Sequence, residues 1–335
     1  MRTASLRKLT VGAVAAGLVL TGCGTTAEGG SAAEGAAQEG PISGLRMLIP
    51  NSAGSGYDTT GREVAKVLES EKLSESIEVF NLEGAGGTVG LQRLVNEEGN
   101  AEMLMQMGLG VVGAQFSNQS EATLDQTTPI AKLIEEAEAI VVLADSPFQT
   151  IDDLVTAWKA DPGNTPVGGA SNPGGPDHLT PMLLAQEVGV TPTDVNYVPY
   201  DGGGELLAGL LGGDVAFAAT GVGEVAESAA SGDVRILAVT SEEPVEGVDA
   251  PTLTEEGVDL VFANWRGIVA APGISEEQTK KFVDTLTEMH GSDAWQQVLE
   301  DQGWTDAFIT GDEFGTFLTE ESDRVEGVMS ELGLV

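Results

Sequence analysis

Residues 51–60 read NSAGSGYDTT, a run of small and polar residues between two regular patterns. The apolar residues 45–49 before it predict a strand, and the apolar spacing within 59–70 predicts a helix after it. A strand that ends in a Gly/Ser loop and leads into a helix presents unpaired backbone N–H groups at the helix start. This stretch therefore predicts an α/β fold with a loop suited to an anion.

The same plan continues along the chain. Strands are predicted over 77–80, 103–107, 140–143, 166–169, 195–198, 215–219, 235–239 and 262–270, and helices over 91–95, 151–159, 182–188, 205–211 and 224–228. A second loop rich in Gly, Ser, Asn and Pro, at 170–178, follows a strand as the first one does. Two lobes that each offer such a loop would form a cleft with N–H groups on both walls.

The N-terminus has the pattern of a secreted lipoprotein. Arg2, Arg7 and Lys8 precede the 12 apolar residues 9–20, which are too few to span a bilayer and typical of a secretory signal. Cys23, the only cysteine, ends the sequence Leu-Thr-Gly-Cys, which resembles the box in which cysteine is lipidated. We therefore expect a signal peptide at 1–22, lipidation at Cys23, and a flexible Gly/Ala/Ser/Glu tether at 23–42.

The charge is strongly acidic. The chain has 53 Asp and Glu against 15 Lys and Arg, a formal net charge of −38. The first 22 residues hold three of the bases and no acid, so the remainder carries 12 bases against 53 acids, or −41. Such a field excludes electrostatic binding to nucleic acid or to an anionic membrane surface. An anionic ligand would have to be held by short-range donors.

Nucleotide, metal and catalytic motifs are not present in a usable form. The glycine pattern of dinucleotide-binding loops fails at Val89 and again at Thr59, and no P-loop occurs. No His/Cys cluster has metal-ligand spacing, so we expect no metal. Ser171, Asp177 and His178 could be imagined as a hydrolase triad, but neighbours in sequence do not face one another as a triad requires. His178 is better interpreted as a hydrogen-bonding partner of the ligand or the loop.

Carboxylate recognition remains the best interpretation. Arginine meets a carboxylate with two parallel hydrogen bonds, and two arginines lie near predicted loops. Arg62 stands one turn into the first helix, where an ion pair is an equally good interpretation. Arg266 lies in an apolar setting beside Trp265. Tyr57 and Tyr200 follow predicted strands, where each could contact a ligand or cover the edge of a lobe.

Six segments, in this order, resemble the substrate-binding proteins of tripartite tricarboxylate transporters, also called Bug proteins. They are IPNSAGSGYDTTGREVA (49–65), NLEGAGGTVG (81–90), GGASNPGGPDHLTPMLLA (168–185), VPYDGGGELLAGLLGGDV (198–215), DAPTLTEEGVDL (249–260) and NWRGIVAAPGIS (264–275). The resemblance extends from about residue 45 to the C-terminus. Tyr57-Asp58 and Trp265-Arg266-Gly267 are most similar to the citrate-binding branch. Asp201 departs from the pattern, since many members have Lys there.

The resemblance implies an α/β, two-lobe periplasmic-binding-protein fold of type II with a hinge of crossing strands. Lobe 1 would comprise 43–143 and 265–335, and lobe 2 would comprise 144–264. No cofactor and no enzymatic activity are implied. The implied substrate-binding residues are Ser52, Ala53, Gly54, Ser55, Gly56, Tyr57, Asp58, Gly86, Thr88, Gly108, Ser171, Asn172, Gly174, Gly175, His178, Tyr200, Thr220 and Arg266.

The function that this resemblance implies is capture of a small di- or tricarboxylate, citrate-like, by an extracytoplasmic protein lipid-anchored to the cell membrane. Its partners would be the large and small membrane subunits of the transporter, and the binding protein itself is expected to be a monomer. Two other functions use the same residues: a sensor that presents a carboxylate to a signalling receptor, and a hydrolase that uses His178. Asp58, which would repel an anion, is expected to cap the helix or orient the loop.

Overall fold

The computed structural model describes residues 40–200 and 202–335 of the chain. Its strands are β1 (Arg46–Ile49), β2 (Glu78–Asn81), β3 (Met103–Gly108), β4 (Thr128–Leu143), β5 (Val167–Gly169), β6 (Tyr197–Pro199), β7 (Phe217–Gly221), β8 (Val234–Val239), β9 (Ala263–Ala270) and β10 (Thr305–Thr310). Its α-helices are α1 (Gly56–Ser70), α2 (Thr88–Val95), α3 (Leu109–Ser117), α4 (Ile151–Ala160), α5 (Pro176–Val188), α6 (Gly203–Gly212), α7 (Val222–Ser231), α8 (Glu276–His290), α9 (Asp293–Gln302) and α10 (Gly311–Glu331). Strand and helix alternate as the sequence predicts for an α/β protein.

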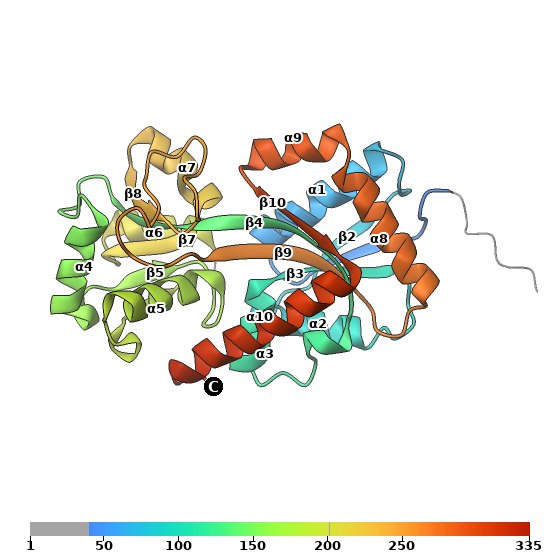
Figure 1. Cartoon of the computed structure of the whole chain (residues 1–335), viewed down its shortest axis with the longest axis horizontal. Helices are drawn as coiled ribbons and strands as arrows, with labels where there is room; N and C mark the ends of the chain where they lie inside the picture. Colours follow the sequence, from blue (N-terminus) through green and yellow to red (C-terminus); the bar gives the residue numbers. More distant parts are fainter. Residues whose placement is uncertain (1–39, 201) are drawn as a thin grey trace, which may run out of the picture. The chain divides into compact units, whose positions relative to one another are not determined.

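These elements form two lobes (Figure 1). Lobe 1 contains β1–β3 with α1–α3 and the C-terminal α8–α10, and lobe 2 contains β5–β8 with α4–α7. The strand order is β2-β1-β3-β9-β4-β7-β5-β6, with β8 and β10 also paired to β4. Within each lobe the strands followed by the glycine-rich loops are parallel to their neighbours, so both loops lie at carboxyl ends of strands. The architecture is the predicted type II periplasmic-binding-protein fold.

Two long strands connect the lobes. β4 pairs antiparallel with β9 from Thr128 to Ala137, and then with β7 and β8 from Glu138 onward. Figure 1 shows β4 and β9 running side by side between the lobes. The predicted hinge of crossing strands is therefore present, and residues around Glu138 lie where β4 passes from one lobe to the other.

The start of β4 was predicted wrongly from the sequence. A strand was predicted only over 140–143, whereas β4 begins at Thr128. Charged residues interrupt the apolar pattern there, and such an interrupted pattern is typical of a loop and not of a buried strand. In the structure Lys132 pairs with Glu135 within the strand and Glu136 pairs with Arg266 of β9, so ion pairing allows these charges to occupy a strand that is buried over most of its length.

The start of α5 was also predicted too late, at residue 182. The helix begins at Pro176, which is its first residue, and Pro181 lies inside it. A proline at the first helical position loses no intrahelical hydrogen bond, whereas one inside the helix does. The Thr180 hydroxyl donates to the Pro176 carbonyl at 2.9 Å. The second loop and the start of α5 are thus one continuous unit.

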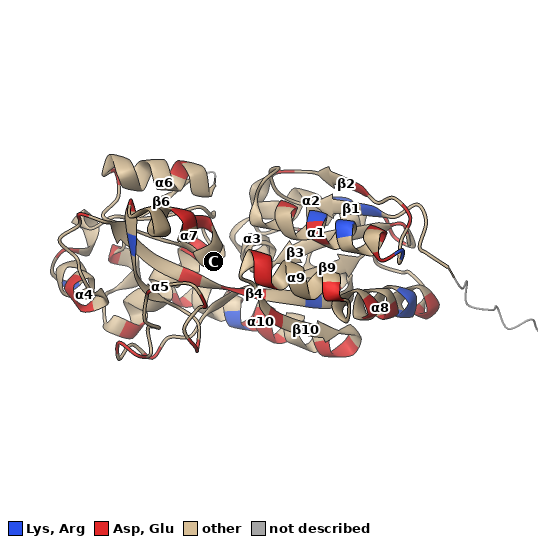
Figure 2. Cartoon of the chain, turned by 90° about the horizontal axis from the view of Figure 1, so that it is seen from above, with Lys and Arg blue, Asp and Glu red and all other residues tan. Residues whose placement is uncertain are grey.

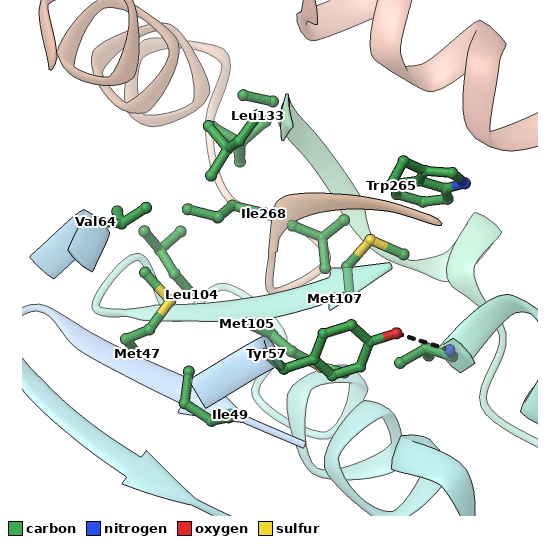
Figure 3. Packing of buried hydrophobic residues seen from close by; sticks show 14 of the residues in the cluster. Met47, Ile49, Tyr57, Val64, Leu104, Met105, Met107, Leu133, Trp265 and Ile268 are labelled. Atoms are coloured by element: carbon green, nitrogen blue, oxygen red, sulfur yellow. Dashed lines mark hydrogen bonds between the residues drawn. The ribbon is translucent and has the colours of Figure 1, made fainter. Parts of the chain in front are cut away.

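Lobe 1 has a core that extends to the floor of the cleft (Figure 3). Met47, Leu104 and Ile268, from three neighbouring strands, are fully buried, and Tyr57 packs at the edge of the same cluster. Lobe 2 has separate clusters on its two sheet faces, one around Trp158 and Phe217 and the other around Leu206 and Leu210. In residues 40–200 and 202–335, no helix has both the length and the apolar character needed to cross a membrane.

Candidate functional site

A cavity of about 790 Å³ lies between the two glycine-rich loops. Twelve of the predicted binding residues line it: Ser52, Ala53, Gly54, Ser55, Gly56, Tyr57, Gly86, Ser171, Asn172, Gly175, Tyr200 and Arg266. They come from both lobes and from the crossing strand β9. A second cavity of about 560 Å³ shares Gly54, Gly56, Glu224 and Arg266 with the first, so the cleft continues past these residues.

The first loop is fixed by Asp58. Ser55 caps α1 and accepts a hydrogen bond from the Asp58 N–H. The Asp58 carboxylate accepts from the Gly54 N–H at 2.8 Å, and also from Arg62 and Asn81, each at 2.9 Å. Burial alone would raise the pKa of Asp58, but these hydrogen bonds outweigh it and lower the pKa. Asp58 therefore orients the loop, as expected, and occupies Arg62 in an ion pair away from the cavity.

The start of α1 offers N–H groups to the cavity. Gly56 and Tyr57 are the first two helical residues, which have no acceptor inside a helix. Neither N–H has an acceptor elsewhere in the described part of the chain. Gly56 also lets the loop approach β9: a Cβ at this position would lie 2.8 Å from the guanidinium carbon of Arg266. Both features suit a ligand carboxylate at this helix N-terminus.

Tyr57 lines the cavity, and its hydroxyl forms a hydrogen bond within lobe 1. The hydroxyl accepts a hydrogen bond from the Val111 N–H at 3.3 Å, at the start of α3 (Figure 3). Burial raises the pKa of the phenol to about 12. The tyrosine therefore stays neutral and joins α1 to α3, which fixes the floor of the cleft.

In the second loop, His178 supports the backbone. Its Nδ1 accepts a hydrogen bond from the Gly174 N–H at 3.2 Å, and its ring meets Tyr197 edge-on. Burial lowers the pKa of His178 to about 4, so the imidazole is neutral. Ser171 lines the cavity, but its hydroxyl is buried without a hydrogen-bond partner among the described residues, and His178 does not hydrogen-bond to it. These residues do not form a hydrolytic triad.

Arg266 reaches the cavity from β9, but its guanidinium group already forms an ion pair and a hydrogen bond within the protein. Its Nη2 donates to Glu136 at 2.6 Å and its Nη1 to Thr60 at 3.3 Å. Arg266 is only 5 % exposed, and its Nε has no partner among the described residues. The sequence predicted this arginine at the site, but not the glutamate that pairs with it.

An acidic wall faces Arg266, and its two residues were not predicted as ligand contacts from the sequence. Asp177 and Glu224, both from lobe 2, line the cavity. Asp177 accepts from the Ala170 N–H at 2.7 Å, and Glu224 accepts from the Thr220 hydroxyl at 2.9 Å. Glu138 lies fully buried nearby, and neither of its carboxylate oxygens has a partner in the described residues.

The protonation of this wall follows from its surroundings. Burial, with the Asp177 charge, raises the pKa of Glu224 to about 7, although water reaches this side chain from the cleft. Burial raises the pKa of Asp177 to about 6 against the hydrogen bond from Ala170. Burial also raises the pKa of Glu138 well above its usual value. The wall therefore changes charge near neutral pH.

We expect the free energy of unfolding to fall as pH rises from about 6.5 to 8. In the folded chain Glu224 and Glu138 keep protons that the unfolded chain has already released near pH 4. As the pH rises further, only the folded chain has these protons to lose, so its free energy rises relative to that of the unfolded chain. His178 acts oppositely only below about pH 6.5, where an unfolded histidine takes up a proton. Urea titrations at several pH values test this. Glu224→Gln should flatten the slope, and an equally steep slope in that variant would contradict the assignment.

The remaining predicted residues do not line the cavity. They are Asp58, Thr88, Gly108, Gly174, His178 and Thr220, and they contact or support residues of the cavity lining. Thr88 donates to the Ala85 carbonyl, Gly108 caps α3, and Thr220 donates to Glu224. The cavity also has lining residues that were not predicted as ligand contacts: Pro50, Asn51, Glu83, Gly84, Ala85, Gly87, Gly110, Ala114, Ala170, Pro173, Pro176, Asp177, Gly202, Gly203, Gly204, Glu224 and Asn264.

Most of these additions lie beside the predicted motifs, and strand-end position could have found them. Asn264 lies two positions before Arg266, and Glu224 opens the helix predicted at 224–228, so both of these also belong to predicted segments. Within residues 40–200 and 202–335, no three His, Cys, Asp or Glu side chains are grouped closely enough to hold a metal ion. Cys23, Asp201 and the predicted signal peptide and tether up to residue 39 lie outside the described residues.

Comparisons with known proteins agree with this geometry. The model of the tripartite tricarboxylate transporter family receptor matches residues 61–334. Protein BugT of Bordetella pertussis is 27 % identical over 300 residues, which cover 88 % of this chain and 90 % of that protein.

Two solved structures have the same fold. MatC of Rhodopseudomonas palustris with bound malate has a TM-score of 0.73 at 22 % identity, covering 86 % of this chain and 99 % of MatC. A second protein of that organism, with adipate, has a TM-score of 0.77 at 21 % identity, covering 88 % and 98 %. The family match covers most of the chain: this chain belongs to the tripartite tricarboxylate transporter receptors, which are solute-binding proteins and not enzymes.

Proposed function

We propose that this protein captures a small di- or tricarboxylate, citrate-like in size, outside the cytoplasm and delivers it to the large and small membrane subunits of a tripartite transporter. The observation that carries the proposal is the donor set of the cleft. Gly56, Tyr57, Ser171 and Arg266 line one cavity, and the N–H groups of Gly56 and Tyr57 have no acceptor among the described residues. The malate and adipate of the two similar structures are carboxylates of the corresponding size.

The two-lobe arrangement supports capture. We propose the lobes as 43–143 with 265–335 and 144–264, and that a ligand bridges them. One carboxylate would lie at the start of α1 beside Arg266, and a second group would contact the loop at Ser171. Charged hydrogen bonds of this kind contribute about 1.5–3 kcal/mol each. The overall acidic charge opposes the approach of the anion, so these short-range donors must supply the affinity.

A panel of carboxylates tests the proposal. Mono-, di- and tricarboxylates should be compared by thermal shift and then by calorimetry, and we expect at least one di- or tricarboxylate to raise the melting temperature. Gly56→Val should weaken binding of that ligand about tenfold or more, because the new side chain collides with Arg266 at the site. Gly327→Val, at an uncrowded position in α10, is the control. A panel without any binding carboxylate would refute the proposal.

We also propose that Cys23 anchors the protein through a lipid, since it ends a lipoprotein-type box after a signal-like segment. Cys23→Ser should move the protein from the membrane fraction to the soluble fraction and leave ligand affinity unchanged, because the tether does not include the cleft. Fractionation of cells that express each form, followed by calorimetry, measures both. Membrane association of the serine variant at the normal level would overturn this assignment.

A further inference from the structure

The crossing strand β4 holds a buried glutamate, Glu138, at the point where the strand passes from one lobe to the other. Ala137 pairs with Ala263 of β9, whereas Glu138 pairs with Gly221 of β7 in lobe 2. The Glu138 side chain is inaccessible to water, and neither of its carboxylate oxygens has a hydrogen-bond partner among the described residues. Buried polar groups without a partner are rare and costly, so a charged Glu138 would be strongly disfavoured in this arrangement.

The backbone of Glu138 is fixed by Thr240, the residue that follows β8. The Glu138 N–H donates to the Thr240 hydroxyl, and the Thr240 N–H donates to the Glu138 carbonyl, both at 2.9 Å. The same hydroxyl donates to the Phe262 carbonyl at 2.6 Å, and the Phe262 N–H donates to the Thr240 carbonyl at 2.9 Å. Because Phe262 leads into β9, Thr240 joins the two crossing strands where they enter lobe 2. Glu138 therefore has a fixed place in the hinge.

The Glu138 side chain lies on the cleft side of β4. Side chains alternate along a strand, so residues 136 and 138 share one face. On that face Glu136 pairs with Arg266 and lines the second cavity. Glu138 lines neither of the two cavities described above, so it lies behind their lining. Only the side chains of that lining separate it from the water of the cleft.

Charged and titratable groups surround Glu138 on each element packed against this face. They are Glu136 on β4, Asp177 and His178 on α5, Tyr197 on β6, Glu224 on α7 and Arg266 on β9. Burial, together with the charges of the three neighbouring acids, raises the pKa of Glu138 well above its usual value. Arg266 opposes this rise but is already paired with Glu136. Asp and Glu also outnumber Lys and Arg over the molecule as a whole (Figure 2). Glu138 is therefore a neutral acid in this structure.

The burial of Glu138 belongs to an arrangement in which the lobes touch. Gly113 of α3 lies against Gly174 of the second loop, where a Cβ at position 113 would lie 2.9 Å from the Gly174 Cα. Met329 of α10 is fully buried beside the same loop, and a Cβ at position 174 would lie 3.1 Å from its terminal methyl group. Separation of the lobes would break these contacts and widen the cleft in front of Glu138, so water could reach it.

We propose that Glu138 couples closure of the two lobes to the uptake of one proton, held as a neutral acid when the lobes close and released to solvent when they open. This rests on the proposed function, since capture requires closure, and it adds that alkaline conditions favour release. An exposed glutamate is ionised above about pH 4.3, so in neutral and alkaline solution only the closed form keeps the proton. Because the closed form binds more protons, closure weakens as pH rises, about tenfold per pH unit for one proton.

Small-angle X-ray scattering of the ligand-free protein between pH 7.5 and 9.5 tests the coupling without any ligand. We expect the ratio of open to closed molecules to rise about tenfold per pH unit. Glu138→Gln and Glu138→Met both lack the titrating group, so above pH 8 each should give nearly the same ratio at every pH. Glu187→Gln, which removes an exposed charge from α5, should respond as the wild type does. Circular dichroism melts establish which variants are folded.

Glu224→Gln separates Glu138 from the acidic wall. The pKa values of Asp177 and Glu224, about 6 and about 7, leave both ionised above pH 8, so this variant should keep the slope there. Calorimetry with malate at pH 8.5, in two buffers of different ionisation enthalpy, counts the protons taken up on binding. We expect about one proton per malate in the wild type and almost none in Glu138→Gln.

Two results would overturn the inference: scattering of the wild type that does not change with pH, or an equal change in the folded Glu138 variants. Loss of the slope in Glu224→Gln but not in Glu138→Gln would assign the proton to the wall instead. If no carboxylate binds, the proposed function fails while scattering still decides the role of Glu138. If malate binds without proton uptake, only this inference fails.

Discussion

Gly113→Ala is expected to weaken ligand binding by about 30- to 150-fold without unfolding the protein. Gly113 lies on α3 in lobe 1, where it faces Gly174 in the second loop. A Cβ at position 113 would lie 2.9 Å from the Gly174 Cα and closer still to its carbonyl group. Overpacking of this kind costs about 2–3 kcal/mol, and backbone cannot move aside as a flexible side chain can. The lobes would have to separate at this contact.

The stability of the ligand-free variant distinguishes this explanation from general damage. Alanine favours a helix interior by about 1 kcal/mol over glycine, so lobe 1 by itself should not be weakened. Calorimetry should therefore show lost affinity, while the melting temperature without ligand stays close to that of the wild type. Gly327→Ala is the matched control, since nothing lies within 4 Å of its Cβ position. Normal affinity in Gly113→Ala would show that the liganded protein lacks the contact.

Arg266→Met is expected to lower the free energy of unfolding by about 3–5 kcal/mol. The ion pair between Arg266 and Glu136 is almost completely buried, with both side chains 6 % exposed. Removal of one partner from a buried pair leaves an uncompensated charge, which accounts for the size of the effect. Here the stranded Glu136 carboxylate would also lie close to the acidic wall.

A second substitution tests the cause. Glu136→Gln in the same chain should recover most of the lost stability, because the amide oxygen can still accept from the Gly223 N–H and carries no charge. Arg93→Met removes a half-exposed arginine from its pair with Glu97 and should cost only about 0–1 kcal/mol. Urea denaturation of the four proteins gives the comparison. A double variant no more stable than Arg266→Met would show that lost packing, not stranded charge, dominates.

The amino-acid sequence by itself determined the local units of this protein. The Gly/Ser run at 51–60 follows a strand and opens a helix, and the fold places it at the cleft as expected. The loop at 170–178 does the same for lobe 2. These features depend on residues close together in the chain, namely apolar periodicity, helix caps and glycines, so a sequence pattern can report them. For this reason most of the predicted binding residues at the two loops line the cavity.

The tertiary structure alone decided the charge of the site. Glu136 and Arg266 are separated by 130 positions, and they meet because β4 pairs with β9 between the lobes. The sequence showed Arg266 as a cation for the ligand, whereas the fold gives it a buried partner and faces it with Asp177 and Glu224. Electrostatic interactions depend on distance in space and on burial, and neither is encoded by local periodicity. The loops could therefore be predicted from the sequence, and the acidic wall required the fold.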